Sequence, residues 1–346
     1  MKKHILIFIS VLTLSFTAKA QDNFEYILLA DKEDASKLLN GYFAPAMEGF
    51  IYGMNNGWYH TAKVHKVLGF DLTVGLSASI VPSKGEIFSV SGLTSIAPNS
   101  FSAPTFAGDD RETSLTVTKQ VMVNGQQETV TADFEIPGGI TGDLPLNAIP
   151  APVAQLNIGL PFKTEAMVRF FPETDLGDDG GKASMYGIGL KKEITSWFGP
   201  LDKLPLHVSL LAAYTAMDVS YGFEDGTNGP ITTTDAKAEF ELRSYTAQAI
   251  ASLNFPIINV YGGIGYSSGN SKLKMSGEYR GEYTYTSGGQ SFTYSEDLTP
   301  PNMDFDAGGF KTTLGARLSL GFFKIFADYT FQEYNTVSAG IALSIR

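Results

Sequence analysis

The last part of the chain alternates between apolar residues and small, polar or charged ones. In the stretch 310–320, Phe310 and Leu314 occupy even-numbered positions, and Lys311 and Arg317 occupy odd-numbered ones. The stretches 323–331 and 337–346 repeat this pattern after short joins. A period of two predicts β-strands with one apolar face. Strands of about ten residues joined by tight turns are typical of transmembrane β-barrels, whose apolar face meets lipid.

Seven further stretches show the same alternation. We expect strands at 68–80, 152–160, 163–171, 183–195, 206–223, 240–254 and 257–268. Because a closed barrel has no edge strand, its first and last strands must pair with each other. The sequence therefore predicts an all-β fold over residues 63–346. It is an antiparallel transmembrane outer-membrane β-barrel of about 10–14 strands, the upper limit allowing for strands hidden in loops.

Long polar joins separate some of these strands. The segment 82–150 is rich in Ser, Pro, Gly and Asp, and the segment 269–309 contains several tyrosines. We interpret both as large extracellular loops, and we expect a hairpin of 114–123 with 128–136 around Asn124-Gly125. The join 196–205 is an exception, because the alternation of long and short joins predicts a short turn at that place.

The N-terminus has the features of a secretory signal peptide, residues 1–20. Lys2 and Lys3 precede an apolar run that is too short for a spanning helix, and Ala18-Lys19-Ala20 suits cleavage. The chain contains no cysteine, which excludes a lipoprotein anchor and disulfide bonds. Its formal net charge of −11 argues against a nucleic-acid partner. These features favour export to the cell outer membrane.

Residues 21–62 do not alternate and are predicted to be partly helical. Asp31 and Asp34 suit a helix start, and Gly41 is expected to end that helix. Such a segment before a barrel either folds into the lumen as a plug or forms a periplasmic extension, and the plug is slightly favoured. Five of its residues are candidates for closing the lumen or contacting a ligand: Phe43, Met47, Phe50, Trp58 and Tyr59.

Charges on the inner face of the strands form a second candidate site. If the apolar faces meet lipid, seven charged residues point inward: Asp71, Glu165, Arg169, Lys311, Arg317, Lys324 and Asp328. Buried charges are tolerated only when they are paired or hydrated. We therefore expect Asp328 to pair with Arg317 or Lys324, and Asp71 to pair with Arg346 across the closing seam. Such a network either packs a narrow lumen or lines a polar conduit.

Signals for catalysis and metal binding are weak. His207 and Ser209 share one strand face, which suits a lipid-modifying enzyme, but no orienting carboxylate is evident. The acidic turns 175–180 and 224–228 offer oxygen ligands for calcium, but their spacing matches no EF-hand loop. Asp, Gly and Asn are also ordinary turn formers. We predict no enzyme activity, no cofactor and no metal site.

Two motifs carry a resemblance to known proteins. The run 55–62, Asn-Asn-Gly-Trp-Tyr-His-Thr-Ala, and the strand start 69–73 resemble a family of uncharacterised Bacteroidota outer-membrane proteins of unknown function. The resemblance covers the mature chain and implies no particular activity. In architecture alone, the broken segment before a barrel resembles the long-chain fatty-acid channel family, whose fourteen-stranded barrel is closed by an N-terminal hatch. The chain departs from many barrels by ending on Ser344-Ile345-Arg346 instead of an aromatic residue.

The sequence leads to two hypotheses about function. The first is a passive outer-membrane channel or binding protein for a small hydrophobic molecule, with residues 21–62 as its plug. The second is a structural or adhesive surface barrel with a sealed lumen, whose acidic loops meet other surfaces. Outer-membrane lipid and the barrel assembly machinery are expected partners in both cases, and nucleic acid is not.

Overall fold

Within the part of the chain that the structure describes, ten antiparallel strands close into one barrel. The computed structural model describes residues 24–140, 147–175 and 181–345, so the predicted signal peptide and Arg346, with its expected pairing to Asp71, lie outside the described residues. The strands follow one another in the order β12, β10, β9, β8, β7, β1, β17, β16, β15, β13, and β13 pairs back to β12. The first strand pairs with the last, β1 with β17. The predicted all-β barrel is confirmed, at the lower end of the expected range of strand number.

The strands of this ring agree in place with the ten alternating stretches of the sequence. Their bounds are β1 Phe70–Ile80, β7 Ala148–Leu160, β8 Thr164–Asp175, β9 Lys182–Glu193, β10 Leu206–Gly222, β12 Ile231–Asn254, β13 Ile258–Ser287, β15 Met303–Leu320, β16 Phe323–Phe331 and β17 Thr336–Ile345. Several strands are longer than expected, above all β12 and β13, which continue beyond the ring.

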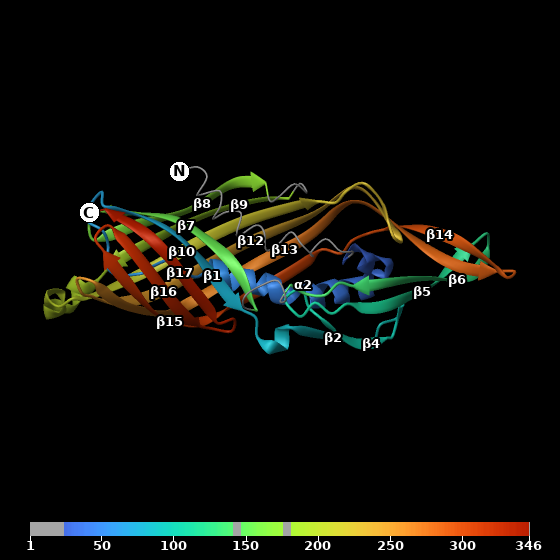
Figure 1. Cartoon of the computed structure of the whole chain (residues 1–346), viewed down its shortest axis with the longest axis horizontal. Helices are drawn as coiled ribbons and strands as arrows, with labels where there is room; N and C mark the ends of the chain where they lie inside the picture. The colour runs from blue at the N-terminus through green and yellow to red at the C-terminus, as the bar shows by residue number, and fades with distance from the viewer. Residues whose placement is uncertain (1–23, 141–146, 176–180, 346) are drawn as a thin grey trace.

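The two ends of the barrel differ (Figure 1). At one end, which we call the base, the joins 161–163, 255–257 and 321–322 are short, and the C-terminal strand ends there. The longer join around 196–205 also lies at the base and contains the 3₁₀ helix η4 (Thr195–Lys203). At the other end, β10, β12, β13 and β15 extend into a second body, which we call the head.

The head is built largely from the two segments that the sequence assigned to loops. Residues 82–150 contain η2 (Ser83–Gly85), β2 (Ile87–Ser91), β3 (Ile96–Ala97), β4 (Ser100–Pro104), β5 (Thr113–Val123) and β6 (Gln126–Ile136). β5 and β6 form the hairpin predicted around Asn124-Gly125. Residues 269–309 are mostly strand instead of loop, because β13 turns at Gly288-Gly289 into β14 (Gln290–Leu298). The short β11 (Gly226–Asn228) pairs with β12.

The two faces of β13 exchange polarity where the ring meets the head. Its outward positions are apolar first and charged later: Ile258, Val260, Ile264 and Tyr266, then Lys272, Lys274, Glu278 and Arg280. Its buried inward positions do the opposite: Asn259, Ser267 and Ser271, then Leu273, Met275, Tyr279 and Tyr283. The strand therefore has a polar interior and an apolar exterior in the ring, and the reverse arrangement in the head.

Neighbouring strands exchange polarity at the same level. Ser244 of β12, Gly269 of β13 and Ala307 of β15 are aligned by the strand register, and we call this line the boundary row. On the head side of the row the outward residues include Glu241 and Asp306, and on the base side they include Tyr245 and Phe310. The change is thus a property of the barrel wall and not of one strand.

An apolar belt surrounds the ring between the boundary row and the base. Every ring strand contributes at least one exposed large apolar side chain: Phe70 and Leu72; Leu156; Val168 and Phe170; Tyr186, Ile188 and Leu190; Leu210 and Tyr214; Tyr245 and Leu253; Ile258, Val260, Ile264 and Tyr266; Phe310, Leu314 and Leu318; Ile325 and Phe331; Ile341, Leu343 and Ile345. Soluble proteins rarely expose a continuous apolar surface of more than a few hundred Å².

The N-terminal segment runs from the head into the barrel (Figure 1). The 3₁₀ helix η1 (Phe24–Leu29) lies in the head, and α2 (Lys32–Met54) follows it. The prediction that this helix ends at Gly41 is wrong, since α2 continues through Gly41 and Pro45. Gly41 instead permits close packing, because a Cβ there would lie 2.5 Å from the Phe88 ring. Packing against the surrounding strands overrides the helix-breaking tendencies of Gly and Pro. No helix among the described residues is long and apolar enough to cross a membrane.

The start of α2 is fixed in the head. Asp31 is the N-cap residue but makes no side-chain cap, while Asp34 Oδ2 accepts hydrogen bonds from the backbone N–H and hydroxyl groups of both Thr94 and Ser95. Burial raises the pKa of Asp34, but these bonds from Ser95 and Thr94 outweigh it and hold the pKa below its ordinary value. The Tyr283 hydroxyl donates to the Leu29 carbonyl at 2.8 Å. The N-terminal segment is thus part of the head's apolar core.

Candidate functional site

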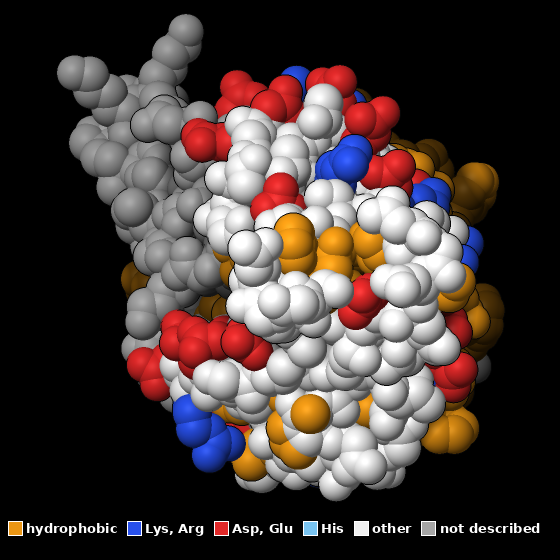
Figure 2. All heavy atoms as spheres, turned by 90° about the vertical axis from the view of Figure 1, so that its right-hand side faces the viewer, with side chains coloured by type: hydrophobic (Ala, Val, Ile, Leu, Met, Phe, Trp, Pro, Cys, Tyr) orange, Lys and Arg blue, Asp and Glu red, His pale blue; other side chains and the backbone are white. Residues whose placement is uncertain are grey.

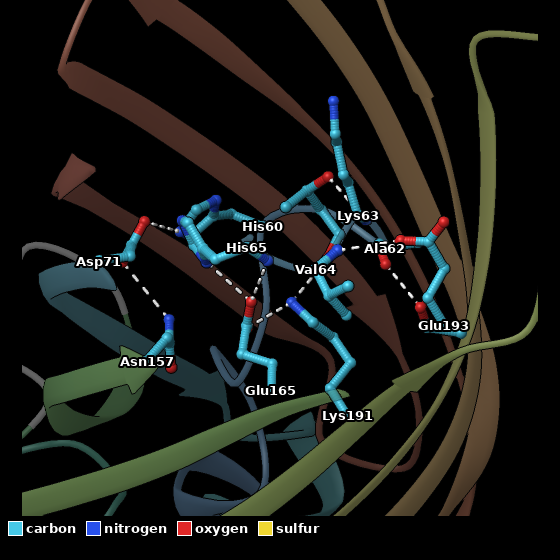
Figure 3. Close-up of polar contacts among 12 residues, drawn as sticks. His60, Ala62, Lys63, Val64, His65, Asp71, Asn157, Glu165, Lys191 and Glu193 are labelled. Atoms are coloured by element: carbon cyan, nitrogen blue, oxygen red, sulfur yellow. Dashed lines mark hydrogen bonds and ion pairs between the residues drawn. The ribbon is translucent and has the colours of Figure 1, made fainter. Parts of the chain in front are cut away.

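Between the boundary row and the base, the N-terminal segment continues through the lumen without regular structure. At the level of the row, Asn55 Nδ2 donates to the Ser268 carbonyl at 3.4 Å. At the base, Leu68 N donates to the Gly159 carbonyl at 2.9 Å. We call residues 55–66 the descending segment. Its contacts with the barrel wall form the candidate site, and Figure 3 shows the lower part of it.

Two cations from the wall cap the end of α2. Arg169 of β8 donates from Nη1 to the Met54 carbonyl at 2.9 Å and from Nη2 to the Asn56 carbonyl at 2.7 Å. Lys311 of β15 donates from Nζ to the Asn55 carbonyl at 2.7 Å. The last turn of α2 has no basic residue of its own. The wall therefore supplies the positive charge that the carbonyl end of a helix favours.

Trp58 and Gln155 also hold the Arg169 guanidinium in place. The guanidinium lies 3.9 Å from the centre of the Trp58 ring, and both side chains are at most 1% exposed. Its Nε donates to Gln155 Oε1, and Gln155 Nε2 donates to the Trp58 carbonyl. Gly189 of β9 leaves room for the indole, since a Cβ there would lie 3.1 Å from the ring. A desolvated cation–π contact contributes about 2 kcal/mol.

His60 connects the descending segment to two wall strands. Its Nε2 lies 3.2 Å from Asp71 Oδ2 on β1, and its Nδ1 lies 2.9 Å from Arg317 Nη1 on β15. Because a guanidinium can only donate, Nδ1 accepts, and the neutral ring carries its proton on Nε2 toward Asp71. Asp71 Oδ1 also accepts from Thr73 at 2.5 Å and from Asn157 at 3.4 Å. Asp71 and Arg317 are thus joined through His60 of the descending segment.

A second polar cluster lies nearer the base (Figure 3). Glu165 Oε2 accepts from the His65 backbone N–H at 3.0 Å and lies 2.7 Å from His65 Nδ1. Glu165 Oε1 pairs with Lys191 Nζ at 2.6 Å, and the ammonium also donates to the Thr61 carbonyl at 3.4 Å. The Val64 N–H donates to a carboxylate of the wall, Glu193 Oε2, at 3.2 Å. Both carboxylates therefore bind the backbone of the descending segment.

The predicted pairing of Asp328 with Arg317 or Lys324 is wrong. Asp328 Oδ2 accepts from the Tyr261 hydroxyl at 2.9 Å, and Arg317 binds His60. Lys324 donates to the Gly321 carbonyl at the base. Arg317 finds its partner in the descending segment and Asp328 finds its partner in a neutral group of the wall, and a pattern read along single strands does not reveal such partners.

The five aromatic and methionine candidates do not form one site. Trp58 and Tyr59 are buried in the lumen, whereas Phe43 and Met47 belong to the core of the head. Phe50 lies between them, with its ring 5.8 Å from that of Phe240. The five residues are thus spread along the N-terminal segment and have different surroundings.

His207 and Ser209 are bonded to other groups and not to each other. His207 Nδ1 lies 3.1 Å from Glu193 Oε1, so a carboxylate partner exists that the sequence did not reveal. Ser209 Oγ is buried and donates to the Ala62 carbonyl at 2.5 Å. A nucleophile needs a free hydroxyl beside its base, and this geometry does not provide one. The described residues contain no cluster of three or more His, Cys, Asp or Glu suited to a metal ion.

Sequence reasoning did not select four residues of this site: His60, His65, Lys191 and Glu193. The signal for the last two was present, because in the stretch 183–195 the apolar Tyr186, Ile188 and Leu190 lie on the opposite parity. The sequence gives less indication of the two histidines. They lie in a segment without alternation, and no sequence pattern shows that this segment contacts inward-facing carboxylates.

The head end carries acidic side chains around a small apolar area (Figure 2). A hollow of about 450 Å³ lies beside η1 at the end of the β10–β12 hairpin, with Tyr221, Phe223 and Glu224 in its wall. A second hollow of about 220 Å³ lies among β8, β9, β10 and β12. Neither hollow reaches the residues of the descending segment.

The chain belongs to a family of unknown function, DUF6588, whose model matches residues 1–345. This agrees with the expectation of a family of unknown function. No curated protein matches the sequence. The family thus supports no particular activity.

Several solved outer-membrane proteins are similar in outline. Ail of Yersinia pestis, in complex with a heparin analogue, has 10% identity and a TM-score of 0.25, over 80% of this chain and 99% of that one. The Escherichia coli outer-membrane protease OmpT has 11% identity and a TM-score of 0.31, over 80% and 97%. The Pseudomonas putida toluene transporter TodX has 7% identity and a TM-score of 0.24, over 87% and 97%. With TM-scores this low, the barrel assignment rests on the strand pairing.

Proposed function

We propose that this protein is an outer-membrane β-barrel whose lumen is sealed by its own N-terminal segment and which carries a folded head on the cell surface. Its role is then structural or adhesive. This is the second of the two functions considered from the sequence. The observation that carries it is the set of direct hydrogen bonds between the descending segment and the wall, above all those of Arg169 and Lys311.

The apolar belt supports the membrane placement. On β13 the belt runs from Ile258 to Tyr266, close to the roughly 9–11 residues that a tilted strand needs to cross a bilayer. The charged outward residues of the head begin just beyond it. Short turns face the periplasm in such barrels and long connections face outward, so the head is assigned to the outer side. Outer-membrane lipid is accordingly the proposed partner of the belt.

The contacts of the descending segment favour a sealed lumen over an open channel. Removing Arg169 alone leaves the carbonyls of Met54 and Asn56 without their donors, at about 1–3 kcal/mol for each buried group. Glu165, Lys191 and Glu193 add bonds to the same backbone nearer the base. Opening a path would break these contacts together. We therefore also propose no enzymatic step for this site.

Conductance across a planar lipid bilayer tests this function. The wild-type protein is expected to conduct almost no current, and the double variant Arg169→Ala, Lys311→Ala is expected to conduct because the end of α2 loses its caps. Arg243→Ala is the matched control, since Arg243 faces outward and pairs with Asp218 at 2.8 Å. Heat-modifiability in gels verifies that each variant retains its barrel. Steady wild-type conductance, equal to that of the double variant, would favour the channel hypothesis instead.

A further inference from the structure

The N-terminal segment passes from the head into the ring at the boundary row. A Cβ on Gly269 would lie 2.7 Å from Ile51 Cγ2, and Asn55 Nδ2 donates to the Ser268 carbonyl. Ile51 and Asn55 are therefore level with the row. The chain before Ile51 packs with the head, and the chain after Asn55 lies inside the ring.

The head side of this segment is not a loose tail. Phe24 packs edge-on against Phe43 with ring centres 5.4 Å apart, and Leu29 accepts the hydrogen bond from Tyr283. Asp34 accepts four hydrogen bonds from the chain between β2 and β3. The apolar core of the head contains residues from η1, from α2 and from β5, β6 and β13. Residues between Phe24 and Met47 thus supply many of the buried side chains of this core.

The other end of the segment emerges at the base. Lys63 and Lys66 are exposed there, and the chain turns directly into β1 after Leu68 donates to Gly159. Residues 24–66 thus extend from the head to the base through the interior of the ring. Because β1 starts at the base, the described chain from η1 reaches its first ring strand by way of the lumen.

We propose that the barrel carries its own N-terminal segment across the membrane, so that residues 24–50 lie on the outer side and complete the core of the head there. The proposal rests on the membrane placement proposed above. It adds a second task to the lumen, which is to pass one part of the chain to the outside. It also orders assembly, since the head core closes only after its N-terminal residues have crossed.

Cysteine labelling in intact cells tests the proposal, because the chain has no cysteine of its own. Glu33→Cys places a thiol in the first turn of α2, where the Glu33 side chain is 83% exposed. Lys63→Cys places one at the base on the same segment. Each single variant of the full chain is treated with a maleimide on a polyethylene glycol too large for outer-membrane pores.

The expected result is labelling of position 33 in intact cells and labelling of position 63 only after the outer membrane is permeabilised. Reaction of both variants in detergent establishes that both thiols are reactive. Protection of position 33 in intact cells, or labelling of position 63 there, would overturn the proposal. Recovery of both variants in the soluble fraction would instead remove the membrane placement, while conductance of the wild type would remove only the sealed lumen.

Discussion

The ring and the head use the same strands with opposite faces. In the ring, Tyr261 and Lys311 lie inside while Ile264 and Phe310 lie outside. In the head, the inside is a single apolar core and the outside is charged. A water-soluble body hides its apolar residues, and a lipid-exposed wall displays them. The surface character thus changes at the boundary row, within continuous strands, as the proposed membrane placement requires.

The same contrast applies to the N-terminal segment. In the head it is held mainly by apolar packing, which is non-directional and tolerates exchange of similar side chains, together with the hydrogen bonds that Asp34 and the Leu29 carbonyl accept. In the lumen it is held mainly by hydrogen bonds to its backbone and by the contacts of the His60 and His65 side chains with wall carboxylates, which depend on particular donors and acceptors. Substitutions should therefore affect the two parts separately.

The largest effect is expected in the core of the head. Leu39→Ala removes a fully buried side chain and should cost about 2–5 kcal/mol of stability. The head should then become sensitive to protease, while the ring keeps its heat-modifiability because its own contacts are unchanged. Lys32→Ala, at an exposed position of the same helix, is the control. Simultaneous loss of ring and head would show that the two parts are not separable.

A similar or slightly smaller effect is expected from a charge on the belt. Ile264→Arg places a cation on the outward face of β13, where the side chain is 64% exposed, and should cost about 2–4 kcal/mol if it lies near the bilayer midplane. Ser276→Arg, outward on the same strand in the head, should cost almost nothing. Denaturant unfolding in lipid vesicles measures both. Equal costs would contradict the placement of the boundary row between them.

The smallest effect is expected from acid. Because hydrogen bonds hold the pKa of Asp34 below its ordinary value, Asp34 stabilises the head at pH values above the ordinary range near 4. That contribution is lost as the pH falls through the lowered folded-state value. Near-ultraviolet circular dichroism of the packed tyrosines should follow this loss.

Two variants sharpen this pH test. Asp34→Asn should remove the acid-dependent part and lower stability at neutral pH, where the carboxylate is ionised. Asp297→Asn, at an exposed position of β14, should leave the pH profile unchanged. An unchanged profile in Asp34→Asn would exclude Asp34 as the source of the acid sensitivity.

The ring could be predicted from the sequence because, within the ring part of each of its ten strands, apolar and polar positions alternate without a change of face. The sequence was insufficient for the head because the parity reverses at Gly269: apolar residues are even-numbered through Tyr266 and odd-numbered from Leu273. Continuous alternation ends at that point, and the sequence therefore predicts a loop over 269–309. Nothing in the local sequence marks the boundary row at which the reversal occurs.

The candidate site was only partly predictable for a related reason. Alternation selects Arg169 and Lys311 as inward-facing, and both are buried. Their partners are backbone carbonyl groups of residues 54–56. Every residue has such a group, so the residue types at these positions give no indication of the contact. The extent of α2 was also hidden, because the wall that supports it beyond Gly41 is formed by strands distant in sequence.

Spin labels along the outward face of β13 test the central claim most directly. Single cysteines from Ile258 to Glu282 are labelled in the protein reconstituted in lipid vesicles, and their collision rates with oxygen and with a water-soluble nickel complex are measured. The account predicts oxygen-rich surroundings through Tyr266 and nickel-accessible surroundings from Lys272 onward. Uniform access to the nickel complex along the whole strand would contradict it, because the apolar belt would then face water.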